Sequence, residues 1–143
     1  MNPDDLCGLN VAVETGTVEE DAINETAKQC KADGKKDITI QSSKQQTDAT
    51  TAVVTGKADV FFADSPVVGY AIAQTEGQLE QLGKDFDSVP NAIAIKKSDS
   101  QTTDAVQKAM QKLMDDGTYG KILQHWGVES GALDKAEINP SVD

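Results

Sequence analysis

Three short apolar runs, separated by stretches of helical length, constrain the fold of this chain more than any other feature. The runs cover residues 9–13, 38–40 and 60–62, and the segments between them carry helix signals. Strands that alternate with helices in this way form βαβ units, in which the strands pair into a mainly parallel sheet. The sequence therefore predicts an α/β fold in which a mainly parallel sheet is the middle of three layers.

The segment after the first run has a clear helix start and a clear helix end. Thr17 followed by Glu20 has the spacing of a capping box, and Gly34 is of a type that often ends helices. Between them, apolar residues fall on one helical face: Val18, Ala22, Ile23, Ala27 and Cys30. This phase points Cys30 toward the sheet that begins just after Cys7. The pair could therefore form a disulfide or remain two buried free thiols.

The later part of the chain changes character. Residues 78–82 and 92–95 are predicted to be further strands, the first of them at an edge of the sheet. Beyond them lie two helices whose apolar stripes are formed by Met110, Leu113 and Met114 and by Ile122, Leu123 and Trp126. We therefore expect two domains, an α/β unit over residues 5–97 and a helical hairpin with a polar tail over residues 98–143.

The charge and the few cysteines and histidines exclude several classes of function. Twenty-four acidic and 13 basic residues give a net charge of -11, which repels phosphate backbones, so we do not expect nucleic-acid binding. With His125 as the single histidine and no CxxC motif, neither a zinc site nor another cofactor is predicted. The N-terminus shows no signal peptide, which fits a cytosolic protein or a piece of a longer secreted one.

Two elements should converge where ligands bind in open parallel sheets, beyond the carboxyl ends of the strands. In the turn from Glu14 to Val18, Gly16 lets the backbone approach a ligand, and the following helix start favours an anion. Asp64 follows the third run and offers a fixed negative charge to an ammonium group. Together the two elements would hold a zwitterion such as a free amino acid. Alternatively, the turn is only a connection, and Asp64 only caps the helix that Pro66 begins.

Four segments of the chain give a resemblance to a known family: DLCGLNVAVETGT, TGKADVFFADSPVVGYA, NAIAIKKSDS and AVQKAMQKLMDDGTYGKILQHWGV. In this order they resemble the family 3 extracellular solute-binding proteins, the polar amino acid receptors of ABC importers. The resemblance implies one lobe of a type II periplasmic binding protein fold and a binding role without catalysis. It also implies an extracellular or periplasmic location, a lipoprotein anchor, and an ABC transporter permease as partner.

The resemblance also assigns roles to individual residues. Asp64 matches the aspartate that takes the ligand ammonium, and the backbone around Gly16, Thr17 and Val18 matches the turn that meets the ligand carboxylate. Glu14 falls where relatives can reach the ligand side chain. The cysteine pair matches a variant of some secreted members, which supports a Cys7–Cys30 disulfide.

The resemblance further implies that the chain is the second lobe plus the C-terminal helices, with Met1 supplied for expression. The helical stripes would then lack their usual partner lobe, so a homodimer through the C-terminal helices is an expected assembly. Two other functions stay open on the same scaffold. One is the ligand-binding half of a membrane sensor, and the other is a dehydratase-like enzyme.

Overall fold

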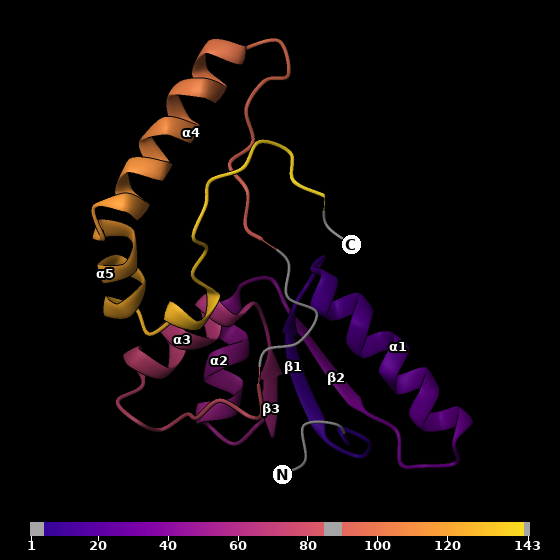
Figure 1. Cartoon of the computed structure of the whole chain (residues 1–143). Helices are drawn as coiled ribbons and strands as arrows, with labels where there is room; N and C mark the ends of the chain where they lie inside the picture. The colour runs from indigo at the N-terminus through magenta and orange to yellow at the C-terminus, as the bar shows by residue number, and fades with distance from the viewer. Residues whose placement is uncertain (1–4, 85–89, 142–143) are drawn as a thin grey trace. The chain divides into compact units, whose positions relative to one another are not determined.

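The computed structural model describes residues 5–84 and 90–141, so Met1 lies outside the described part. The chain divides into two compact units, the first of which ends at Lys84. The first unit alternates strands and helices along the chain (Figure 1): β1 (Asn10–Glu14), α1 (Val18–Ala32), β2 (Thr39–Ser43), α2 (Gln46–Val54), β3 (Val60–Phe62) and α3 (Ser65–Gln74). The three apolar runs of the sequence thus correspond to the three strands.

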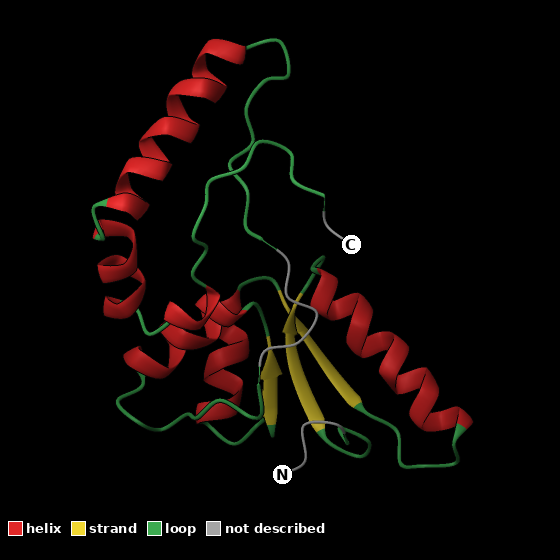
Figure 2. Ribbon diagram, viewed as in Figure 1, coloured by secondary structure: helices red, strands yellow, loops and turns green. Residues whose placement is uncertain are grey.

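The strands of the first unit form one parallel sheet in the order β2-β1-β3. Val11 of the central strand lies opposite Ile40 on one side and Val60 on the other. Figure 2 shows α1 on one side of this sheet and α2 on the other. Right-handed crossovers require this placement, because β2 and β3 are added on opposite sides of β1. The predicted three-layer α/β fold is confirmed.

Alternation along β1 builds a core on each face of the sheet. Val11 and Val13 are fully buried and pack with Ile23 of α1, whereas Ala12, also fully buried, packs with Ala49 of α2. Successive side chains of a strand point to opposite faces, so one apolar strand serves both helices. Small alanines on the second face leave room for α2 to lie close to the sheet.

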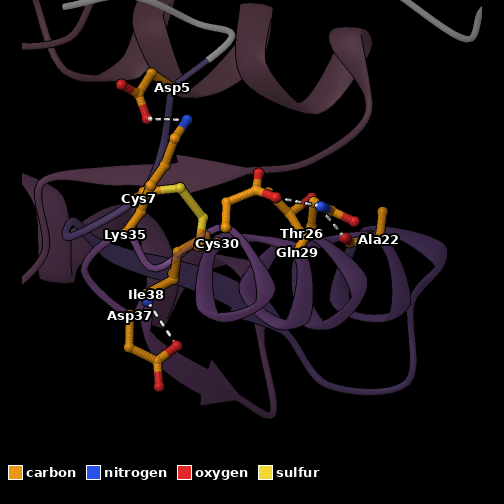
Figure 3. The surroundings of a disulfide bond; sticks show 10 residues. Asp5, Cys7, Ala22, Thr26, Gln29, Cys30, Lys35, Asp37 and Ile38 are labelled. Atoms are coloured by element: carbon orange, nitrogen blue, oxygen red, sulfur yellow. Dashed lines mark hydrogen bonds and ion pairs between the residues drawn. A yellow bond between two sulfur atoms is a disulfide. The ribbon is translucent and has the colours of Figure 1, made fainter.

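A disulfide joins Cys7 to Cys30 near the C-terminal end of α1, with 5.7 Å between the two Cα atoms. Figure 3 shows the bond beside the ion pair between Lys35 and Asp5, whose charged atoms are 3.8 Å apart. The bridge and the Cys30 side chain belong to the valine face of the core. The helical phase had pointed Cys30 toward the sheet and left two outcomes open; the disulfide is confirmed, and the alternative of two free thiols is excluded.

The strands predicted over residues 78–82 and 92–95 are wrong. Both segments are irregular and contain no strand. Ile93 is 60% exposed, so the apolar alternation around it is not covered by a core in the described residues. A strand needs the N–H and C=O groups of a neighbouring strand, and sequence alternation alone does not provide that neighbour.

The second unit contains the two predicted helices, α4 (Ser100–Asp115) and α5 (Thr118–His125), followed by the short 3₁₀ turn η1 (Glu129–Gly131). Asp99 caps α4 by accepting a hydrogen bond from the Thr102 N–H at 3.0 Å. The Gln107 and Gln111 side chains bind the backbone of Ala136, which ties the irregular tail to α4. The hairpin arrangement and a domain boundary after Lys97 stay predictions.

Candidate ligand-binding site

A cavity lies at the carboxyl ends of β1 and β3 in the first unit. The strand ends supply Glu14, Phe62, Ala63 and Asp64 to its lining, and the helix starts supply Thr17, Glu19, Gln46 and Val67. In the order β2-β1-β3 all strands are parallel, but β2 is added on one side of β1 and β3 on the other. Open α/β sheets bind ligands at such a point, where the strand order reverses. The cavity has a volume of about 60 Å³, whereas pockets that enclose a small molecule reach roughly 300–1,000 Å³. The cavity of this unit is therefore too small by itself to enclose a small molecule.

Asp64 lies in the lining with its carboxylate available. Its backbone carbonyl accepts hydrogen bonds from the N–H groups of Val67 and Val68 at 2.9 and 3.0 Å, so the backbone starts α3. The side chain makes no capping hydrogen bond, and no described residue forms an ion pair with it. The carboxylate of Asp64 is exposed and does not act as a helix cap.

Thr17 begins α1 as the capping-box spacing predicts. Its hydroxyl group donates to the Glu14 carbonyl at 2.8 Å and accepts from the Glu20 N–H at 3.2 Å. Gly16 has a φ of 81°, a conformation that favours glycine, and this brings the chain from β1 directly into α1. The helix start is thereby fixed at the edge of the cavity.

The Glu20 carboxylate binds the backbone N–H of Gly16, one residue before the N-cap residue Thr17 that a capping box would use. The carboxylate accepts from the Gly16 N–H at 2.7 Å and from the Ser42 hydroxyl of β2 at 2.5 Å. The Gly16 hydrogen bond, and secondly the Ser42 hydrogen bond, lower the pKa of Glu20. A standard capping box would use the Thr17 N–H instead. Within the described residues, the N–H groups of Thr17 and Val18 consequently have no acceptor.

The residues predicted to form the site are only partly brought together. Glu14, Thr17 and Asp64 line the same cavity, whereas Gly16 and Val18 do not. The Gly16 N–H is occupied by Glu20, and the Val18 side chain is 77% exposed. Contacts of Gly16 and Val18 with a ligand stay predictions.

The electrostatics of the lining favour a cation. Glu14, Glu19 and Asp64 contribute three carboxylates, and no lysine, arginine or histidine lines the cavity. None of the ion pairs among the described residues involves these three side chains. Unpaired carboxylates around one cavity attract a positively charged group and bind it in preference to an anion.

Sequence reasoning missed Gln46, the first residue of α2. Its side chain lines the cavity, and its Nε2 atom is buried without a hydrogen-bond partner. Sequence reasoning also missed Glu19, in the first turn of α1. One signal was present for both: each is a polar residue in the first turn of a helix that follows a parallel strand. That signal does not say which of such residues face a ligand.

Two classes of feature are absent from the residues that the structure describes. No group of three or more His, Cys, Asp or Glu side chains over residues 5–84 and 90–141 could hold a metal ion. Nor does any helix in these ranges combine the length and apolar character that crossing a membrane requires.

Comparison with known proteins places residues 7–129 against the sequence profile of the bacterial extracellular solute-binding proteins, family 3. The arginine-binding protein ArgT of Corynebacterium glutamicum is 41% identical over 140 residues, which cover 97% of this chain and 46% of ArgT. The chain thus spans about half the length of this relative.

Two solved structures share the fold. One is an ancestral arginine-binding protein bound to arginine, with a TM-score of 0.67 and 25% identity, matched over 87% of this chain and 53% of that one. The other is an ancestral amino acid-binding protein described as a precursor of cyclohexadienyl dehydratase. It has a TM-score of 0.62 and 29% identity, over 83% of this chain and 47% of that one.

Proposed function

Because this chain belongs to the bacterial extracellular solute-binding proteins of family 3, we propose that it binds a free amino acid for an ABC importer. One observation carries the proposal. The unpaired carboxylate of Asp64 and the start of α1, with its free N–H groups, meet at the same cavity. A cation acceptor and an anion donor at one strand edge match the two charges of a zwitterion.

Each group has a role in this proposal. Asp64 accepts hydrogen bonds from the ligand ammonium, because its side chain is exposed and is not engaged as a helix cap. The N–H groups of Thr17 and Val18 donate to the ligand carboxylate at the positive end of α1. Gly16 supports this turn through its left-handed conformation. Glu14 faces the ligand side chain from the end of β1.

The class of ligand that we propose is a cationic amino acid, with arginine as the first candidate. Asp64 pairs with the α-ammonium group of the ligand. Glu14 and Glu19 then remain for a second positive group, on the side chain of the ligand. The 41% identical relative is an arginine-binding protein, and one of the similar structures is an arginine-binding protein bound to arginine. Both observations support the same choice of ligand.

The wider assignment follows from the family. We propose an extracellular or periplasmic protein with a lipoprotein anchor, which delivers its ligand unchanged to a transporter permease. The small cavity supports a site completed by a second wall, which closes over the ligand as in a hinged binding protein. The 143-residue chain by itself should therefore bind an amino acid very weakly or not at all.

Calorimetric titration of the protein at its full natural length tests the proposal. Arginine, lysine, glutamine, glutamate and alanine are added in turn, and arginine should bind most tightly. Asp64→Asn removes the charge that meets the ammonium and should weaken arginine binding by about 100-fold, since a lost charge-assisted contact costs roughly 3 kcal/mol. Asp48→Asn is the matched control, because Asp48 is exposed in the first turn of α2 and does not line the cavity.

Four results would contradict the proposal or a part of it. The protein could bind none of the five amino acids, or Asp64→Asn and Asp48→Asn could have equal effects on affinity. Micromolar binding by the 143-residue chain alone would refute the need for a second wall. Recovery of the ligand in chemically altered form would favour an enzyme over a carrier.

A further inference from the structure

We propose that Gln46 is a ligand-binding residue of this site, and that its Nε2 group donates a hydrogen bond to the carboxylate of the bound amino acid. The inference rests on the proposed function, because it names a further contact within the same cavity. No recurrent motif marks Gln46, which follows β2 as the first residue of α2.

The observation behind this proposal is an unsatisfied donor. Among the side-chain nitrogen and oxygen atoms of the described residues, Gln46 Nε2 is the buried one that lacks a hydrogen-bond partner. Buried polar groups are nearly always paired, because an unpaired one loses its bonds to water and gains nothing in return. An exception in the lining of a cavity indicates a group whose partner arrives from outside the protein.

The residues around Gln46 give its side chain no evident role in holding the fold together. Gln46 begins α2, but the N-cap residue Gln45 makes no side-chain hydrogen bond to the helix, and α2 is held by Ala49 against the sheet. The Gln46 side chain instead contributes to the same lining as Thr17 and Asp64. It therefore lies among the groups that would meet the ligand.

The chemistry of the ligand decides which of its atoms Gln46 meets. An amide NH₂ group can only donate, so its partner must be an acceptor. In arginine at neutral pH, the ammonium and guanidinium groups are both donors, and the acceptors are the carboxylate oxygens. Gln46 therefore faces the carboxylate end, together with the N–H groups at the start of α1. The cationic groups are left to the carboxylates of the lining.

Two substitutions at this position separate a contact with the carboxylate from other roles. Gln46→Ala removes the donor and should weaken arginine binding about tenfold, the usual effect of losing one hydrogen bond to a charged group. Gln46→Glu keeps the size but adds a negative charge, and it should weaken binding further by repelling the ligand carboxylate. Gln45→Ala and Gln45→Glu are matched controls, because Gln45 is the exposed neighbour and is absent from the lining.

The measurement is calorimetry with arginine on the protein at its full natural length, with thermal unfolding of each variant to show that it folds. In the wild type, the side-chain NH₂ resonances of Gln46 should also shift when arginine is added, and those of Gln45 should not. If arginine binds but all four variants match the wild type, the role of Gln46 is refuted and the proposed function stands. Tighter binding by Gln46→Glu would place Gln46 at a cationic group and would also refute it. If the wild type binds no amino acid, both proposals fail.

Discussion

The two units of this chain differ in how their apolar residues are used. Every buried hydrophobic residue among those described lies in the first unit, where β1 has three consecutive residues with no exposed surface. In the second unit, α4 and α5 have well-separated apolar and polar faces but no buried residue. Ile122 of α5 and Trp126, which directly follows the helix, remain 49% and 46% exposed.

The difference shows that an apolar pattern and a buried core are separate properties. α1 has a mostly polar sequence, yet it buries Ile23 and Cys30 because a sheet lies against it. The stripes of α4 and α5 are more regular, but a stripe is buried only if another apolar surface covers it. The predicted dimer through the C-terminal helices is one way to cover these stripes, and it stays a prediction.

The sharpest test of this comparison is the same substitution made once in each unit. Ile23→Ala should lower the free energy of unfolding of the first unit by about 4 kcal/mol, because the side chain is 1% exposed and its removal leaves a cavity. Ile122→Ala should cost less than about 1 kcal/mol, because half of that side chain already meets water. Urea unfolding followed by circular dichroism measures both. Equal losses would mean that Ile122 is buried in solution, as in a dimer.

The disulfide should stabilise the first unit and leave the second unchanged. Cys7 and Cys30 are 23 residues apart, and in a chain-entropy model a loop of this size contributes about 3 kcal/mol. Cys7→Ser with Cys30→Ser should therefore lower the stability of the sheet, as amide hydrogen exchange of β1 would show. Trp126, the single tryptophan, reports on the second unit by fluorescence. If the double substitution also shifted the unfolding transition seen by Trp126 fluorescence by the same amount, the two units would not unfold independently.

The smallest expected effect concerns two carboxylates whose pKa values are lowered by hydrogen bonds. Glu20 is held by Gly16 and by Ser42 on a different element, whereas Asp99 is held by Thr102 of its own helix. A lowered pKa in the folded state means that each contributes stability above its ordinary pKa, about 4.5 for Glu20 and 3.8 for Asp99. That contribution is lost as the pH falls through the folded-state value.

Ser42→Ala should raise the pKa of Glu20 toward 4.5 and leave that of Asp99 unchanged. Carboxyl resonances followed by NMR from pH 6 to about pH 2 measure both groups. An unchanged Glu20 titration would mean that the bond to Ser42 does not form in solution. A change at Asp99 would mean that the two units communicate.

The sequence by itself determined the order of the elements and several of their local features. Short-range rules predict the strand runs, the Thr17 cap and the helical phase that points Cys30 toward the sheet, because each depends on residues a few positions apart. The position of Asp64 at the end of β3 was also evident, since a charged residue directly after an apolar run marks the end of a buried strand.

Only the tertiary structure decided which of these features meet. It placed β1 between its neighbours, which brings the ends of β1 and β3 to one cavity, and it left residues 92–95 irregular. It also engaged Glu20 with Ser42, 22 positions away, and left the Gln46 donor buried and unpaired. Hydrogen-bond satisfaction depends on atoms from several elements at once, so no local pattern could reveal it.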